Sequence, residues 1–251
     1  MHGSFHAAWA WEDYVLGALA AEGRRAVAYS LRGQAGSSAC ASTPTLEEHT
    51  ADLAKVAQAV TERSGGVPPV VVGHSFGGLV VQQYASGAVE HPHASAYALA
   101  ASVPPTGNKA MIGRFFRRDP LASLRLTWAF AAGGAKRDAS QCRETFFCDT
   151  TDEAVVEQAM ARMQGAPPLL DLKRLDAESL PIGSPADREA AFAVFGAVGD
   201  NIVDKEGVEE AARFYGAGAP RWLKGGHDVM LDVSKEAFVK DLLEWMDELH
   251  A

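Results

Sequence analysis

The sequence predicts an α/β fold with a mostly parallel sheet covered by helices on both faces. Near both ends of the chain, short apolar runs alternate with segments of helical spacing. The run Val70–Val72 follows two prolines and is β-branched throughout, as is typical of a buried parallel strand. A length of 251 residues suffices for one sizeable domain with an insertion.

The individual elements follow from periodicity and from end signals. Apolar residues recur at helical spacing over 9–21 and 46–62, and Thr45 with Glu48 forms a plausible capping box at the start of the second segment. Thr151 or Asp152 is expected to cap a further helix. The predicted helices are 9–21, 46–62, 76–88, 152–164, 205–215 and 234–249, and the predicted strands are 26–29, 70–72, 97–101, 191–195 and 220–223.

The middle of the chain, from Pro104 to Pro185, breaks the alternation. It holds helix formers and aromatic residues and contains no convincing strand. A helical insertion between two parallel strands is most simply a lid over their carboxyl ends, where ligands of α/β proteins bind. We therefore expect a core formed by residues 1–103 and 186–251 and a helical cap formed by residues 104–185.

Composition excludes several classes of protein. The net charge of -9 disfavours nucleic-acid binding, and no apolar run is long enough to span a bilayer. The basic cluster 114–118 is either a solvated face or a contact for an anionic head group. Three cysteines without zinc-like spacing predict no metal site and favour a reducing compartment. The first residues show no signal-peptide pattern, so we expect a soluble intracellular protein, cytoplasmic or plastid, without cofactor.

The strongest functional signal lies between Gly73 and Gly78. The segment reads Gly-His-Ser-Phe-Gly-Gly and joins the strand that ends at Val72 to a predicted helix. Glycines two residues before and after Ser75 permit the tight strand-to-helix turn that raises a serine hydroxyl above a sheet. We expect Ser75 to be a nucleophile and the N–H of Phe76, at the helix start, to be an oxyanion donor.

A serine nucleophile needs a histidine base, which is oriented by a carboxylate, and this turn predicts the chain order serine, acid, histidine. His227 follows the last predicted strand and is the favoured base. Asp200 follows the penultimate strand and is the favoured acid. Asp204 is the alternative, although it fits better as the start of the next helix, and Asp228 would have to fold back on its neighbour. The other downstream histidines are His91, His93 and His250.

The second oxyanion donor is expected from the segment that opens the chain. His2 and Gly3 form a His-Gly motif before the first predicted helix. By geometry, the N–H of Ser4 would join that of Phe76 in holding an oxyanion. The alternative is that His2 and His6 are ordinary polar residues near the N-terminus.

Five ordered motifs together resemble the α/β-hydrolase superfamily, and they span essentially the whole chain. They are His2-Gly3, 31–35, 73–78, 196–200 and Gly226-His227-Asp228. The resemblance implies a Ser75, Asp200 and His227 triad and a helical cap over an acyl pocket. Segments 102–108 and 144–147 further resemble a little-characterised plant and algal branch. Ser75 replaces the aspartate of epoxide hydrolases and dehalogenases, and Asp228 replaces the lysine of hydroxynitrile lyases.

We expect a serine hydrolase that cleaves a carboxylic ester, or a related acyl bond, of a small and largely apolar molecule. Phe5, His74, Trp128 and Phe146 are expected to line the substrate pocket. The alternatives are a non-catalytic ligand-binding or signalling protein of the same fold, and lyase or carbon–carbon hydrolase chemistry on the same triad. The sequence leaves the oligomeric state open.

The chain departs from the superfamily at its start. A central strand normally precedes the His-Gly motif, between the strands predicted at 26–29 and 70–72, whereas only Met1 precedes it here. A gap in a parallel sheet would leave backbone groups unpaired. Either the chain is an N-terminally truncated form that lacks the first strands, or the two neighbours close up directly. We favour truncation.

Overall fold

The structure is a computed structural model that describes residues 1–37, 42–88, 90, 94–131, 133–163, 182–187 and 189–249. Its centre is a four-stranded sheet with the order β1-β2-β3-β4. Every pairing is parallel, with Val70 opposite Ala96 and Ala96 opposite Ala191. The strands are β1 (Val70–His74), β2 (Ala96–Ala100), β3 (Ala191–Ala197) and β4 (Arg221–Leu223).

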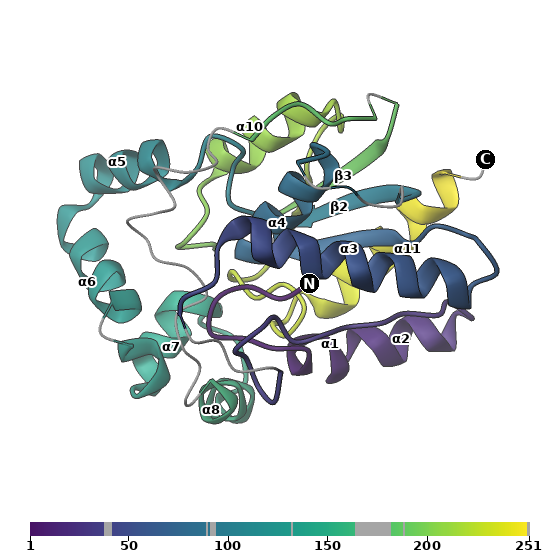
Figure 1. Cartoon of the computed structure of the whole chain (residues 1–251). Coiled ribbons are helices and arrows are strands. Elements are labelled where there is room, and N and C mark those ends of the chain that lie inside the picture. The colour runs from purple at the N-terminus through teal and green to yellow at the C-terminus, as the bar shows by residue number, and fades with distance from the viewer. Residues whose placement is uncertain are drawn as a thin grey trace.

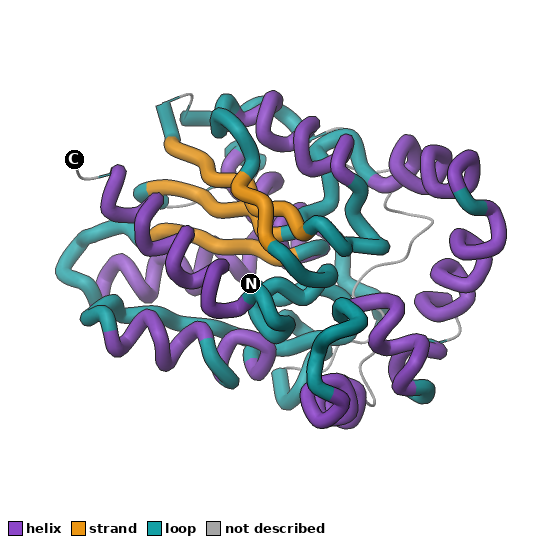
Figure 2. The backbone as a smooth tube through the Cα atoms, turned by 180° about the vertical axis from the view of Figure 1, so that it is seen from behind, coloured by secondary structure: helices purple, strands orange, loops and turns teal. Residues whose placement is uncertain are grey.

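Helices cover both faces of the sheet (Figures 1 and 2). One face packs against α1 (Trp9–Glu12), α2 (Val15–Ala21) and α11 (Lys235–Glu248). The other packs against α3 (Leu46–Arg63), α4 (Phe76–Ala85) and α10 (Lys205–Tyr215). Along β2, Ala96, Ala98 and Ala100 belong to the first cluster and Tyr97 and Leu99 to the second, which is the period of two of a strand buried on both sides.

The segment after β2 forms a group of helices beside the sheet (Figure 1). These are α5 (Asn108–Arg118), α6 (Pro120–Ala131), the short 3₁₀ helix η1 (Gly134–Lys136), α7 (Ala139–Phe146) and α8 (Glu153–Arg162). The amide of Asn201, which follows β3, donates to the carbonyl of Glu144 in α7, so α7 lies at the carboxyl edge of the sheet. None of the helices in the described ranges is long and apolar enough to cross a membrane.

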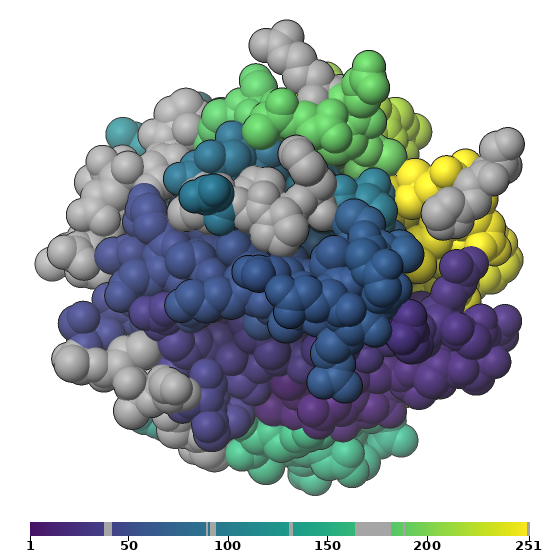
Figure 3. Space-filling view, turned by 45° about the vertical axis from the view of Figure 1, so that its right-hand side comes forward, coloured from purple at the N-terminus to yellow at the C-terminus, as the bar shows by residue number. Residues whose placement is uncertain are grey.

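The N-terminal segment lies between the core and these helices. Figure 3 shows it in purple, packed between the blue surface above it and the green helix below. Arg162 of α8 forms an ion pair with Asp13, at the end of α1. The guanidinium of Arg162 also stacks over the ring of Trp9, 4.6 Å from its centroid. The first residues are therefore fastened to the helical insertion as well as to the sheet.

Most element predictions are confirmed to within a few residues. The capping box of Thr45 and Glu48 is present, and Asp152 caps α8 by accepting from the N–H of Ala154. One predicted helix is wrong in part, because residues 9–21 form two helices separated at Asp13 and Tyr14. The consecutive residues 9–11 are all buried, which one face of a straight helix cannot achieve.

The strand predicted at 26–29 is wrong. The structure has no strand there, and Val27 is 67% exposed. A strand needs a neighbour to satisfy its backbone, and β1 pairs with β2 rather than with this segment. Beside β1, Met1 instead donates to the carbonyl of Val72 at 2.5 Å and accepts from the N–H of His74 at 3.0 Å. Residues 26–29 therefore do not pair directly with β1, so that alternative is wrong. The other alternative, that the first strands of the fold are missing from the chain, stays a prediction.

Candidate active site

Ser75 lies at the junction of β1 and α4 in a strained conformation. Its φ is 53° and its ψ is -121°, a region that residues with a side chain rarely occupy. A Cβ added at Gly73 would lie 2.5 Å from the carbonyl oxygen of Gly77, and one at Gly77 would lie 2.4 Å from that of His2. Glycine is thus required on both sides of the serine, as the motif predicted.

Asp200 and His227 meet above the carboxyl ends of β3 and β4. Asp200 Oδ2 lies 2.9 Å from His227 Nδ1, and both side chains are almost fully buried. The other carboxylate oxygen accepts from the N–H groups of Ile202 and Val203 at 2.7 and 2.9 Å, which fixes its orientation. Asp200 therefore requires the proton of His227 on Nδ1, and Nε2 is left as the basic nitrogen.

The environment of His227 favours its protonated form. Burial by itself lowers the pKa of this imidazole, but the charge and hydrogen bond of Asp200 and the charge of Asp228 outweigh burial, so the pKa is raised above the ordinary 6.5. A base of this kind is stronger than a free imidazole, and its positive form after proton transfer is stabilised.

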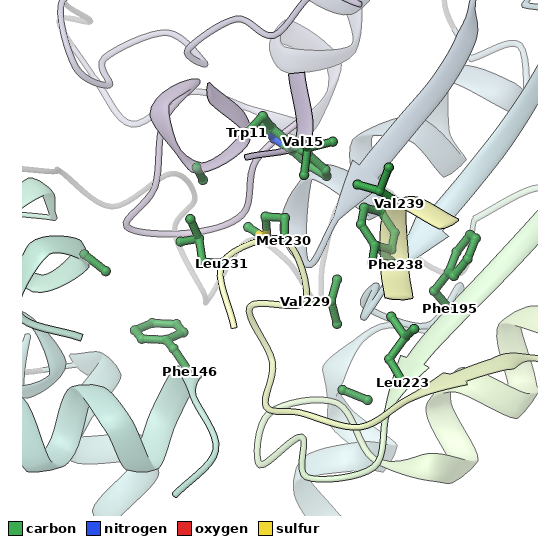
Figure 4. Close-up of a cluster of buried hydrophobic side chains, with 14 of the residues drawn as sticks. Trp11, Val15, Phe146, Phe195, Leu223, Val229, Met230, Leu231, Phe238 and Val239 are labelled. Carbon is green, nitrogen blue, oxygen red and sulfur yellow. The ribbon is translucent and has the colours of Figure 1, made fainter. Parts of the chain in front are cut away.

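The loop of His227 is anchored in the core. Val229 and Met230 are completely buried, and Figure 4 shows them among Phe238, Leu223 and other apolar side chains of the sheet and of α11. His74 holds the same loop from the other side, because its Nε2 donates to the carbonyl of His227 at 3.0 Å. Burial lowers the pKa of His74 well below its ordinary value, so the ring is neutral.

The segment of Gly3 places Ser4 near the hydroxyl of Ser75. A Cβ at Gly3 would lie 2.7 Å from the Cβ and 3.2 Å from the Oγ of Ser75. Within the described ranges, the N–H groups of Ser4 and Phe76 have no hydrogen-bond acceptor, which suits two oxyanion donors. Ser75 Oγ likewise makes no hydrogen bond to His227 in the described part of the chain, and such contacts often tighten only when substrate binds.

The predicted pocket residues divide into two groups. The rings of Phe5 and Phe146 lie 6.2 Å apart, both pack on Phe130, and Phe146 lies 6.3 Å from the ring of His227. These rings form an apolar wall beside the base. His74 is buried, with its ring 4.7 Å from that of His227.

Trp128 lies elsewhere. It is 67% exposed and borders a cavity of about 230 Å³ between α5, α6 and α7. The described lining of that cavity includes Asn201, the neighbour of Asp200, but neither Ser75 nor His227.

The other acidic and histidine candidates have separate places. Asp204 caps α10 and forms an ion pair with Arg114, as expected for the start of that helix. Asp228 Oδ2 lies 2.7 Å from Nε2 of His6, so it orients a different imidazole. His91, His93 and His250 lie outside the described residues.

Sequence reasoning missed two contacts of this site. The pairing of His6 with Asp228 joins residues 222 positions apart, and no local pattern announces it. Asp232 accepts from Gly226 N–H, next to His227, at 2.5 Å and from Cys148 N–H after α7 at 3.0 Å. No local sequence pattern distinguishes Asp232 from a solvated aspartate.

Three side chains of the site could in principle act as metal ligands. Ligand atoms of His74, His227 and Asp228 lie within 4.8 Å of one another. One atom of each already makes a hydrogen bond: Nε2 of His74 to a carbonyl, Nδ1 of His227 to Asp200, and Oδ2 of Asp228 to His6. Only the second nitrogen or oxygen of each side chain is therefore left for another partner.

Comparison with known proteins agrees with this arrangement of sheet, turn and loops. Residues 1–241 match the alpha/beta hydrolase family, and the chain belongs to it. A search among curated proteins returned no match.

Solved structures share the fold at low sequence identity. An esterase from Exiguobacterium antarcticum has a TM-score of 0.74 at 18% identity, covering 98% of this chain and 90% of its own. A thermophilic esterase from Thermogutta terrifontis has a TM-score of 0.69 at 18% identity, with coverages of 100% and 89%. A putative non-heme bromoperoxidase from Mycobacterium tuberculosis has a TM-score of 0.69 at 22% identity, with coverages of 100% and 91%.

Proposed function

We propose that the protein is a serine hydrolase that cleaves a carboxylic ester, or a related acyl bond, of a small and largely apolar substrate. The observation that carries the proposal is the hydrogen bond of Asp200 to His227, in a loop held against the residue that precedes the strained Ser75. Membership of the hydrolase family and two esterases among the structural neighbours support the same reaction class.

In the proposed reaction, Ser75 Oγ attacks the ester carbonyl carbon while His227 Nε2 takes the hydroxyl proton. The carbonyl oxygen becomes an oxyanion between the N–H groups of Ser4 and Phe76. His227 then gives the proton to the leaving alcohol, and an acyl-serine remains. Water, deprotonated by the same imidazole, attacks the acyl carbon; the bond to Ser75 Oγ then breaks, the acid is released, and the imidazolium returns the proton to Ser75 Oγ. Asp200 stabilises the imidazolium in both steps.

The apolar substrate class follows from the residues around the base. Phe5, Phe130 and Phe146 present ring surface beside His227, and apolar lining selects apolar acyl or alcohol groups. We propose Phe5, His74 and Phe146 as pocket residues, whereas Trp128 borders the separate cavity between α5, α6 and α7. The cap of residues 104–185 over the core of residues 1–103 and 186–251, and the plant and algal branch, stay predictions.

A fluorophosphonate probe tests the nucleophile directly, because it labels an activated serine without requiring the natural substrate. We expect the wild-type chain to be labelled at Ser75 and Ser75→Ala to be unlabelled. Ser86→Ala is the matched control, since Ser86 ends the helix that Ser75 begins. A folded wild-type protein that takes no label would favour the non-catalytic ligand-binding alternative.

A further inference from the structure

The loop that carries Ser4 is held by histidines rather than by a sheet. His2 Nδ1 donates to the carbonyl of Gly3 at 2.8 Å, and the N–H of His6 reaches the same oxygen at 3.4 Å. Nδ1 of His6 lies 2.7 Å from the carbonyl oxygen of Ser4. Between them, Phe5 has a φ of 67°, which is unusual for a residue with a large side chain. The surrounding bonds must hold this turn in place.

The two ring nitrogens of His6 both face acceptors. Nδ1 faces the carbonyl oxygen of Ser4, which has no proton to give, so Nδ1 must carry one. Nε2 faces the carboxylate oxygen of Asp228 at 2.7 Å, in a pair with no solvent exposure. One proton is shared in that contact, and its place on the imidazole would give His6 two ring protons and a positive charge that the adjacent carboxylate balances.

His2 shows the contrast. Its Nδ1 donates to a carbonyl, but its Nε2 accepts from the N–H of Leu31 at 2.9 Å, so the ring needs only one proton. Burial lowers the pKa of His2 to about 3, with the positive charges of the terminus and of nearby histidines acting in the same direction. The two histidines of one loop thus differ in their hydrogen-bond partners: both ring nitrogens of His6 face acceptors, whereas one ring nitrogen of His2 faces a donor.

We propose that His6 and Asp228 form an imidazolium–carboxylate pair that positions the Ser4 loop against the His227 loop. This inference rests on the proposed function, because the Ser4 N–H matters as an oxyanion donor. Asp228 is adjacent to His227, and its own N–H donates to the carbonyl of Phe146 at 2.9 Å. Asp228 therefore contacts the Ser4 loop through its carboxylate and the chain at Phe146 through its backbone N–H, and it is itself part of the His227 loop.

The pair also sets the electrostatic balance around the base. The groups facing His6 are Asp228, the neutral rings of His2 and His74, and the apolar rings of Trp9 and Phe146. Those facing Asp228 also include His227 and Cys142, whose thiol has a pKa raised to about 12, first by burial and then by Asp228. The positive charge of His6 offsets the carboxylate of Asp228. Without it, the uncompensated carboxylate would raise the pKa of His227 further.

Nitrogen-15 NMR of the wild-type chain tests the protonation state and needs no turnover. We expect both ring nitrogens of His6, assigned by their loss in His6→Gln, to remain protonated from pH 6 to pH 9. An unprotonated Nε2 in this range, with the proton on Asp228, would overturn the proposal even if the enzyme is active. Conversely, two protonated nitrogens in a chain that no fluorophosphonate labels would reject the proposed function and leave the ion pair standing.

Kinetics test the positioning role. A misplaced oxyanion donor should lower kcat by on the order of 10- to 100-fold in His6→Gln, with KM changed less than about threefold. The acidic limb of kcat/KM should move to higher pH in His6→Gln and return in the double variant His6→Gln/Asp228→Asn, in which neither charge is present. Tyr215→Phe is the matched control, because it removes a buried long-range hydrogen bond to Gln82 away from both loops. If kcat fell in His6→Gln but the acidic limb of the kcat/KM profile stayed at the same pH, the His6–Asp228 pair would be only a structural contact, and the proposed charge would be rejected.

Discussion

At the scale of single residues, the geometry of Ser75 has an energetic cost. The backbone of Ser75 has a φ of 53° and a ψ of -121°. The chain on either side is closely packed, with Gly73 against Gly77 and Gly77 against His2. Backbone strain of this kind costs on the order of 1–3 kcal/mol and persists only where the surroundings enforce it. In the proposed reaction this turn raises the nucleophile above the sheet, which would account for such a cost.

The strain makes a prediction about stability. Ser75→Gly should raise the free energy of unfolding by about 1 kcal/mol relative to Ser75→Ala, because glycine occupies this backbone region freely. Both variants should lose ester hydrolysis, by on the order of 10⁴- to 10⁶-fold. Urea denaturation and hydrolysis of p-nitrophenyl esters measure the two effects. Equal stability of the variants would show that residue 75 is unstrained.

A second prediction at this scale concerns pH. Only neutral His227 acts as a base, so kcat/KM should fall as the pH drops through its raised pKa. Asp200→Asn removes the charge that raises this pKa, and the acidic limb should move to lower pH while kcat falls by about 10⁴-fold. The pH–rate profiles of the wild-type protein and of Asp200→Asn test this prediction. An unmoved limb would mean that another carboxylate orients the base.

At the scale of elements, an ion pair joins the helices after β2 to a helix that covers the sheet. Arg114 of α5 pairs with Asp204, which caps α10. The guanidinium of Arg114 donates two hydrogen bonds, of 2.6 and 2.8 Å, to the carboxylate of Asp204, which also accepts from the N–H of Gly207. Burial raises the pKa of Asp204, but the bonds from Arg114 and Gly207 and the nearby arginine charges outweigh it and lower the pKa. The contact therefore depends on an ionised carboxylate.

Acid should weaken this link. Because the folded-state pKa of Asp204 is lowered, its contribution is fully present above the ordinary value of 3.8 and is lost as the pH falls through the folded value. Asp204→Asn should lower the free energy of unfolding at pH 7 by about 1–3 kcal/mol, and by less at pH 3. Asp138→Asn is the control, since Asp138 caps α7 and forms no ion pair within the described ranges. Thermal denaturation at both pH values measures the difference, and equal losses at the two would contradict it.

Element predictions succeeded where local chemistry decides the structure. The β-branched Val70–Val72 and the glycines around Ser75 need only their sequence neighbours to specify a strand and a turn. The strand predicted at 26–29 failed because a strand also needs a partner, and apolar composition carries no information about what lies beside it. The interruption between α1 and α2 after Glu12 was not predicted for a similar reason. It depends on which side chains are buried in the core, and local spacing does not determine this.

At the scale of the whole molecule, the order of motifs along the chain was enough to predict the α/β-hydrolase fold. The hydrogen bond between Asp200 and His227 could be anticipated from the loops that follow successive strands. The contacts of Asp228 with His6 and of Asp232 with Cys148 could not, because they join distant segments through single side chains. Nothing in the local sequence distinguishes these aspartates from solvated ones.

The apolar wall predicts substrate preference. Each buried methylene is worth about 0.8 kcal/mol, so kcat/KM should rise from p-nitrophenyl acetate to at least the hexanoate. Phe146→Ala should flatten the rise more than Trp128→Ala, because Phe146 is 1% exposed beside His227 whereas Trp128 is 67% exposed. A preference for acetate over every longer ester would mean that the pocket is small or polar.

Asp232 limits how this chain could be recombined with its relatives. Its carboxylate accepts from the N–H groups of Gly226 and Cys148 and from the hydroxyl of Thr151, so the end of the helical group and the loop of His227 share one anchor. A chimera that imports the corresponding helices of a relative with its crossover beyond residue 151 would lose the contacts of Asp232 with Cys148 and Thr151 and leave a buried carboxylate with fewer hydrogen bonds. Such chimeras should therefore retain residues 148–151 of this chain.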